Sequence, residues 1–115
     1  MPRKALTVER AVDDFTVWFK VERGATTATI RAYTGTLYRL CSHFPHDDPT
    51  TFETADLRRF ILDEWGEKTT TTRAAVISHL RTFFGWLAEE YGCDDPMSPV
   101  RRPRKRQRRV ARLDL

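Results

Sequence analysis

The feature that most constrains this fold is a helical spacing of apolar residues, which recurs in four segments of the chain. In each segment apolar side chains return every three or four positions, which places them along one face of an α-helix. Clusters of turn-forming residues separate the segments, and none of the segments shows the strict alternation of a β-strand. The spacing therefore predicts an all-α fold, a compact bundle of four helices.

Residue types with defined roles at helix ends mark where these helices begin and stop. Threonine side chains accept hydrogen bonds from the first turn of a helix, and the expected N-caps are Thr7, Thr26 or Thr27, Thr54 and the threonine run at 69–72. Glycine and proline end helices, and the expected stops are Gly24, Pro45, Gly66 and Gly92. The four helices therefore occupy most of the chain up to residue 92.

The segment that follows the fourth helix has a different composition. Residues 96–115 carry three prolines and eight Lys or Arg residues with one acidic residue, a net charge of +7. Residues 1–95 hold 12 basic and 15 acidic residues, so the +4 of the whole chain comes from its end. Proline-rich, charged segments are extended and stiff. We therefore predict a helical domain over residues 1–95 and an extended basic linker over residues 96–115.

Composition also disfavours several classes of protein. No apolar run approaches the ~20 residues that span a bilayer, and the N-terminus lacks the apolar block of a secretory signal. The two cysteines form no Cys-x-x-Cys pair, and the three histidines do not share metal-ligand spacing with cysteines or carboxylates. We expect a cytoplasmic protein with no membrane contact, no metal ion and no cofactor.

Acidic residues are missing from the second and fourth expected helices. No Asp or Glu lies between Glu22 and Asp47, and none lies between Glu67 and Glu89. The polar faces of these two helices carry arginine, hydroxyl and very small side chains, and threonines stand at both helix starts. Guanidinium, hydroxyl and helix-start N–H groups donate to phosphates, and small residues let a helix approach another backbone closely. The two faces are either solvated surfaces or one surface that grips an acidic partner.

Three segments, at 25–44, 54–61 and 68–105, carry motifs in a defined order. They read ATTATIRAYTGTLYRLCSHF, TADLRRFI and KTTTTRAAVISHLRTFFGWLAEEYGCDDPMSPVRRPRK. These motifs resemble the second, third and fourth helices of the N-terminal core-binding domain of the tyrosine recombinases, the phage-integrase family. The matching positions are Thr26, Thr29, Ile30, Tyr33, Thr72, Ile77, Leu80, Arg81, Phe83, Phe84, Trp86, Leu87, Pro96, Val100 and Pro103. One departure is Asp95, where the family often has Asn.

The resemblance implies a SAM-like helical domain that forms half of a clamp around double-stranded DNA at a recombination core site. Its second and fourth helices would face the major groove, and other recombinase protomers would join it in a synaptic complex. The basic linker would follow the phosphate backbone toward a catalytic domain that this chain lacks. The residues expected to contact DNA are Thr27, Arg31, Gly35, Arg39, Lys68, Thr70, Thr72, Arg73, Ser78, Arg81, Thr82, Arg101, Arg102, Arg104 and Lys105.

The resemblance also places catalysis outside this chain. In the family, a tyrosine assisted by Arg, Lys and His residues of the catalytic domain cleaves the DNA strand. Tyr33, Tyr38 and Tyr91 lie in helical patterns without such a set of partners. We therefore expect no catalytic residue here and a tyrosine recombinase as the parent protein.

Two other functions stay open on the residues alone. The first is an all-α protein-interaction module, whose acid-poor faces dock an acidic partner. The second is a stand-alone helix-turn-helix DNA-binding protein, which would rely on one dominant recognition helix instead of two. Duplex binding separates the first alternative from the recombinase module, and variants on each of the two helices separate the second.

Overall fold

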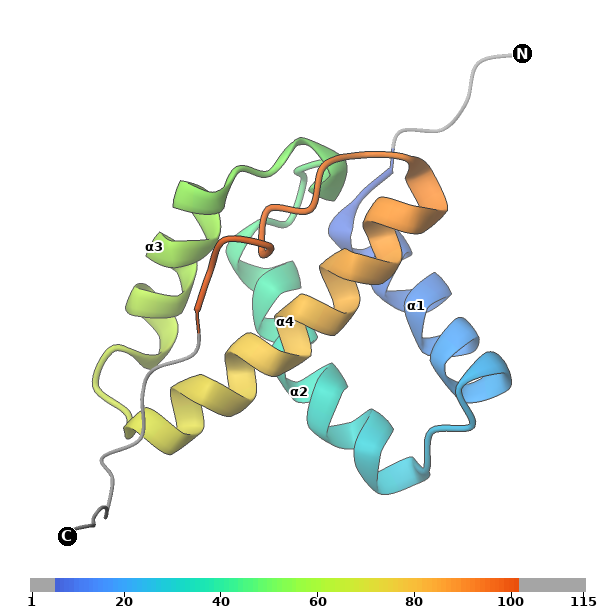
Figure 1. The fold of residues 1–115 in the computed structure, drawn as a ribbon, viewed down its shortest axis with the longest axis horizontal. Helices are drawn as coiled ribbons and strands as arrows, with labels where there is room; N and C mark the ends of the chain where they lie inside the picture. Colours follow the sequence, from blue (N-terminus) through green and yellow to red (C-terminus); the bar gives the residue numbers. More distant parts are fainter. Residues whose placement is uncertain (1–5, 102–115) are drawn as a thin grey trace, which may run out of the picture.

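The computed structural model describes residues 6–101, and all regular secondary structure in that range is helical (Figure 1). The helices are α1 (Val8–Glu22), α2 (Thr27–His43), the short 3-10 helix η1 (Pro49–Thr51), α3 (Thr54–Trp65) and α4 (Thr70–Tyr91). The longest helix, α4, packs against the other three, and Figure 1 shows α1 and α3 on opposite sides of it. The predicted all-α bundle of four helices is confirmed.

The helix ends follow the predicted signals at most positions. The hydroxyls of Thr7, Thr26 and Thr69 each accept a hydrogen bond from the backbone N–H three residues later, at 3.1–3.2 Å. Gly24 and Gly92 follow α1 and α4 with φ angles of +62° and +66°, a backbone region in which a Cβ is strained. Sequence therefore locates both ends of α4 and the turn between α1 and α2.

The predicted cap of the third helix is wrong. Glu53 is the N-cap of α3, and its backbone N–H donates to Asp56 Oδ2 at 2.9 Å. The hydroxyl of Thr54 instead donates to the carbonyl oxygen of Pro96 at 2.8 Å. That hydroxyl bonds a segment 42 residues away, and the side chains of Glu53 and Asp56 form the capping box at the helix start.

The expectation of an extended segment from Pro96 onward needs a correction for its first five residues. Met97 is fully buried and Val100 is 6% exposed, and both belong to the core cluster. Asp95 Oδ1 accepts the N–H of Met97 at 2.9 Å, which turns the chain back over α4. Burial of Met97 and Val100 anchors this turn to the core. Pro96 and Pro99 are compatible with the turn. The division at residue 95 stays a prediction for the basic part, because residues 102–115 lie outside the described range.

The core is built mainly from the apolar stripes of the four helices. Phe83 and Phe84 are fully buried, as predicted, and Trp18 packs partly buried against the core cluster. Phe15 lies beside five aromatic rings of α1, α2 and α4, at centroid separations of 5.0–6.2 Å. Cys41, expected in the core, is half-buried against it. Burial raises the pKa of its thiol, so this cysteine stays protonated and packs as a small apolar residue.

Within residues 6–101, none of the helices is long and apolar enough to cross a bilayer. No group of three or more His, Cys, Asp or Glu side chains there is arranged to hold a metal ion.

Candidate nucleic-acid interface

An open groove of about 490 Å³ lies between α2, the first half of α4 and the end of α3. Most of its lining side chains are small or carry a hydroxyl, and none is acidic; they are Ala32, Gly35, Thr36, Arg39, Trp65, Thr71, Thr72, Ala75, Val76 and His79. A Cβ added at Gly35 would meet no atom within 4 Å, so the space above this residue is open. The groove is therefore open above Gly35 and free of carboxylates along its lining.

Thr36 and His79 join α2 to α4 along the groove. Thr36 is 6% exposed, and its Oγ1 lies 2.8 Å from His79 Nδ1. The His79 ring packs on Tyr33 at a centroid distance of 4.4 Å. Burial lowers the pKa of His79, so the imidazole is neutral at neutral pH. These contacts fix the spacing of the two helices, and with it the width of the groove.

Arg39 is the cation that lines this groove, and it is held in place from α3. Its Nη1 donates to Glu64 Oε1 at 2.9 Å, and its guanidinium lies 5.5 Å from the Trp65 ring centroid. His43 Nδ1 lies 3.2 Å from the other oxygen of Glu64. The bond from Arg39 is the main reason that the pKa of Glu64 is lowered, so this carboxylate stays ionised. Arg39 is thus oriented at the groove edge, with its charge partly offset.

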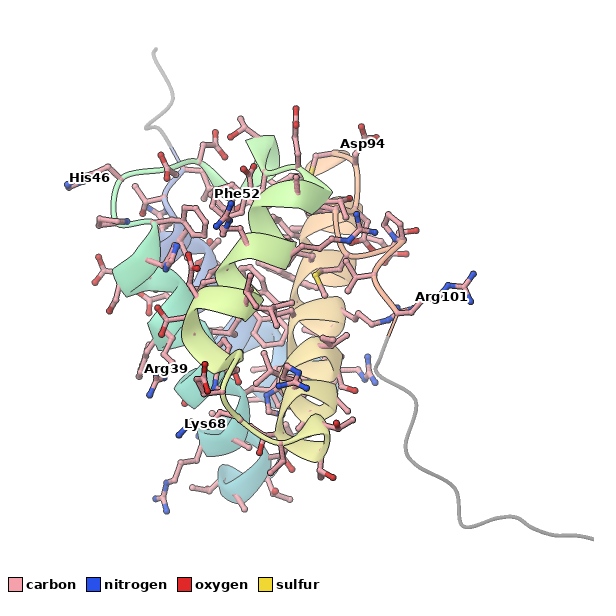
Figure 2. All side chains as sticks on the ribbon, turned by 90° about the vertical axis from the view of Figure 1, so that its left-hand side faces the viewer. Arg39, His46, Phe52, Lys68, Asp94 and Arg101 are labelled. Atoms are coloured by element: carbon pink, nitrogen blue, oxygen red, sulfur yellow. The ribbon has the colours of Figure 1, made fainter. Side chains whose placement is uncertain are left out.

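The structure brings only some of the predicted contact residues to the groove. Gly35, Arg39 and Thr72 line it. Arg31 is exposed one turn before Gly35, and its side chain has no ion-pair partner in the described range. Figure 2 shows Arg39 and Lys68 on the same side of the molecule, with Arg101 projecting from the opposite side.

The predicted face of α4 is largely used inside the protein. Arg73 Nη1 donates to three carbonyl groups of the α3–α4 turn. Arg81 donates to the carbonyl of Val100, so it holds the buried C-terminal turn. Thr82 donates to the Ser78 carbonyl, and its hydroxyl lies 3.4 Å from that of Tyr33. These three side chains therefore have structural partners, and the open face of α4 is the neighbouring one.

The other predicted contacts lie at the helix starts and in the basic segment. Thr27 and Thr70 are the first residues of α2 and α4, immediately after the caps Thr26 and Thr69. The cap hydroxyls already take one N–H of each first turn. Arg101 is exposed at the end of the described range. The predicted contacts Arg102, Arg104 and Lys105 lie outside it.

The groove also contains residues that the sequence interpretation missed. Ala32, Thr36, Thr71, Ala75 and His79 line it but were not among the expected contacts. A signal for the first four exists, because small and hydroxyl side chains recur at helical spacing along both helices. That stripe lies directly beside the arginine stripe, and only the packing of α2 on α4 decides which of the two borders open space.

Similarity to known proteins agrees with this architecture. The family described as phage integrase, N-terminal SAM-like domain, matches residues 12–91, from within α1 to the end of α4. The chain is also 31% identical over 102 residues to tyrosine recombinase XerD of Listeria monocytogenes serovar 1/2a (strain ATCC BAA-679 / EGD-e). That alignment covers 84% of this chain and 34% of XerD, so the chain spans about a third of that relative. No solved structure gives a significant match. Because the family match covers well over half of its residues, the chain belongs to the phage integrase N-terminal SAM-like domain family.

Proposed function

We propose that this chain is the core-site DNA-binding module of a site-specific tyrosine recombinase, and that the α2/α4 groove is its DNA-binding surface. The observation that carries the proposal is the absence of carboxylates from the lining of a groove built by these two helices. The 12 basic and 15 acidic residues up to residue 95 would give a uniform surface no attraction for DNA. Their segregation leaves one face on which phosphates meet no acidic lining.

The chemistry of the groove suits a nucleic-acid backbone. Arg39 lines it. Arg31 on the same helix and Lys68, two residues before the first residue of α4, are exposed cations. Threonine hydroxyls donate to phosphate oxygens, and Ala32, Gly35 and Ala75 leave room for close approach. Contacts of this kind provide affinity and position the protein on the duplex. Sequence reading would come from the side chains that reach base edges.

The proposal assigns strand cleavage to a different part of the recombinase. In the described range, Tyr33 packs against His79, and its hydroxyl lies 3.4 Å from that of Thr82. Tyr38 is 61% exposed on α2 and Tyr91 40% exposed at the end of α4. Incubation of the chain with supercoiled plasmid should leave the plasmid supercoiled, and relaxation would contradict this assignment. Further protomers, each with its own core-binding module, would complete the assembly on DNA.

Fluorescence anisotropy of a labelled mixed-sequence duplex tests the groove. Binding at low salt should weaken steeply as salt rises, because phosphate contacts release counterions. Replacement Arg31→Ala should reduce the slope of log K against log salt by about 1 if Arg31 contacts a phosphate. The matched control Arg10→Ala removes an arginine from α1, where Arg10 only faces Asp14 at 3.8 Å.

Equal effects of Arg31→Ala and Arg10→Ala would show that the groove has no special role. Loss of binding from variants of one helix alone would favour the stand-alone helix-turn-helix alternative. No retention of duplex at any salt concentration, together with tight binding of an acidic protein, would favour the protein-interaction module.

A further inference from the structure

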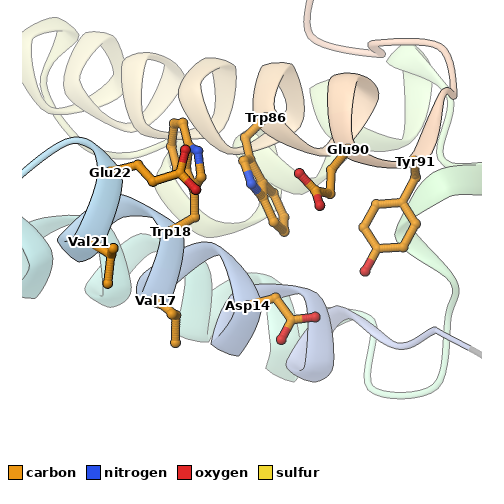
Figure 3. A pocket seen from close by; sticks show the side chains of 8 residues that line it. All are labelled: Asp14, Val17, Trp18, Val21, Glu22, Trp86, Glu90 and Tyr91. Atoms are coloured by element: carbon orange, nitrogen blue, oxygen red, sulfur yellow. The ribbon is translucent and has the colours of Figure 1, made fainter.

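A second hollow lies between α1 and the C-terminal end of α4, and it shares no lining residue with the α2/α4 groove. This α1/α4 cleft has a volume of about 250 Å³. Its lining combines aliphatic, aromatic and acidic side chains: Asp14, Val17, Trp18, Val21, Glu22, Trp86, Glu90 and Tyr91 (Figure 3). No Lys or Arg lines it. The cleft lining is therefore acidic, whereas the groove lining has no acidic residue and includes Arg39.

The aliphatic edge of the α1/α4 cleft is unusually exposed. Val17 is 62% exposed and Val21 is 73% exposed, and they lie four residues apart on one face of α1. Apolar side chains that gather beside a hollow mark a surface for another molecule, whereas single exposed ones do not. A partner that covers both valines would remove their apolar area from water.

The carboxylates of Asp14, Glu22 and Glu90 in the cleft lining favour a positively charged partner. Asp14 faces Arg10 across 3.8 Å, with both side chains well exposed. Glu22 and Glu90 have no ion-pair partner within residues 6–101. Arg23 already lies over the Trp18 ring, at 5.6 Å from the centroid, so this aromatic surface accepts a guanidinium. A cation that enters the cleft would meet carboxylates and aromatic faces together.

Trp86 supplies an unmet hydrogen-bond donor. The residue is only 7% exposed, and its Nε1 is the buried side-chain polar atom of the described range that lacks a partner. Figure 3 shows the Trp86 ring between Trp18 and Glu90, with its nitrogen edge turned toward Trp18. A buried N–H without an acceptor is costly. A carbonyl oxygen that displaces the side chains over this edge would satisfy it.

We propose that the α1/α4 cleft docks a peptide segment of a partner protein in which an arginine is flanked by aliphatic residues. The guanidinium lies among Glu22, Glu90 and the aromatic rings. The aliphatic neighbours cover Val17 and Val21, and a peptide carbonyl accepts the Trp86 N–H. Nucleic acid is repelled here by the same carboxylates that attract the arginine. The chain would thus hold DNA on one side of the bundle and a basic protein segment on another.

The test follows the indole N–H signal of Trp86 by NMR in the full chain, with acetyl-Leu-Arg-Leu-amide as the probe. Trp86→Phe assigns the signal among the three tryptophans. Binding should move this signal downfield and weaken with added salt. The same peptide with citrulline in place of arginine keeps the shape and loses the charge, so it should bind more weakly. Glu90→Gln and Glu22→Gln should each weaken arginine-peptide binding about two- to fivefold.

Glu9→Gln is the matched control, because it removes a carboxylate of α1 that does not line the cleft. All these glutamates are exposed, so their variants should fold. Three results would overturn the proposal. One is no movement of the Trp86 signal at up to about 10 mM peptide, which covers millimolar affinities. Another is equal binding of the arginine and citrulline peptides. The third is movement of the signal with protein concentration alone, since a second copy of the chain would then be the occupant.

Discussion

The two ends of α4 face opposite kinds of surface. The first half of the helix, from Thr71 to His79, lines a groove with α2 that has no carboxylate among its lining residues. The last part, from Trp86 to Tyr91, lines a cleft with α1 in which every charged lining residue is acidic. One helix thus separates an acid-free hollow from an acidic one.

The distribution of charge over this domain therefore matters more for its binding surfaces than the net charge does. The first 95 residues carry slightly more acidic than basic side chains, which by itself argues against a nucleic-acid partner. The acids are concentrated on α1, on α3 and in the loops, and α4 has acids only near its C-terminal end. An almost neutral domain therefore presents one surface that suits phosphates and another that repels them.

The largest loss of duplex affinity is expected when a carboxylate is introduced into the groove. Ala75 is exposed and lines the groove, so Ala75→Glu should leave the fold intact and place a carboxylate opposite the phosphates. Like charges brought together at an interface cost several kcal/mol, and duplex affinity should fall by on the order of 100-fold. Anisotropy with the labelled duplex measures the loss. Ala55→Glu adds the same charge to the exposed start of α3 and should have little effect. Equal losses from the two variants would remove the distinction between the faces.

A smaller effect is expected from the ion pair at the groove edge. Arg39→Ala should weaken duplex binding by about 1–3 kcal/mol if this arginine reaches a base edge, and by less if it contacts a phosphate. Glu64→Gln should strengthen binding, because it removes the carboxylate that holds Arg39 at 2.9 Å. Glu9→Gln makes the same change of net charge on α1 and serves as the control in the same titrations. Weaker duplex binding by Glu64→Gln would contradict this expectation. It would mean that Glu64 helps binding by positioning Arg39 more than it hinders binding by offsetting the charge of Arg39.

Glycine replacements separate stability from binding. An added Cβ at Gly35 meets no atom within 4 Å, so Gly35→Ala should stabilise the protein by up to ~1 kcal/mol through its helix propensity. The same methyl group enters the groove and should weaken duplex binding. At Gly85 the nearest atom, Asp95 Oδ2, is 4.0 Å away, and this glycine lies outside the groove. Gly85→Ala should therefore add similar stability in urea unfolding and leave binding unchanged. A Gly35→Ala variant with unaltered duplex affinity would argue against close approach of DNA to α2.

The smallest effect concerns the pH dependence of stability. Burial lowers the pKa of His79 in the folded chain below its unfolded value of about 6.5. Below about pH 6.5 the unfolded chain therefore binds more protons at this residue than the folded chain does. The contribution of neutral His79 to the free energy of unfolding is complete above about pH 6.5 and is lost as the pH falls below it. His79→Gln should flatten the change in urea midpoint between about pH 7 and pH 5. His46→Gln, in the exposed loop after α2, is the control. Parallel pH profiles for wild type and His79→Gln would contradict the burial of an uncharged imidazole at the groove.

Most of the fold could be predicted from local signals, because the stripes and caps act within a single helix. Thr7, Thr26 and Thr69 cap their helices as expected. Thr54 is not the cap, because Glu53 occupies that position. The Thr54 hydroxyl instead bonds the distant Pro96 carbonyl, which the sequence around residue 54 does not indicate. The burial of Met97 and Val100 is likewise a tertiary effect. It depends on how the chain packs after α4, which local sequence signals do not indicate.

The sequence indicated the two helices that border most of the groove, but not which of their faces border it. On α4 the chosen stripe contains Arg81, which the returning chain engages through the Val100 carbonyl. The stripe that borders open space includes Ala75 and His79, one step around the helix. The crossing of α2 and α4 determines this rotation, and crossing geometry depends on side-chain packing across helices far apart in sequence.

DNA should bind to the α2/α4 groove and avoid the α1/α4 cleft. Backbone amide NMR of the isotopically labelled chain, titrated with a mixed-sequence duplex, tests this prediction most directly because every residue reports separately. The shifts should be concentrated over residues 31–39 and 68–79, and the amides of residues 14–22 and 86–91 should stay unmoved. Shifts concentrated at the α1/α4 cleft, or spread evenly over all four helices, would contradict it.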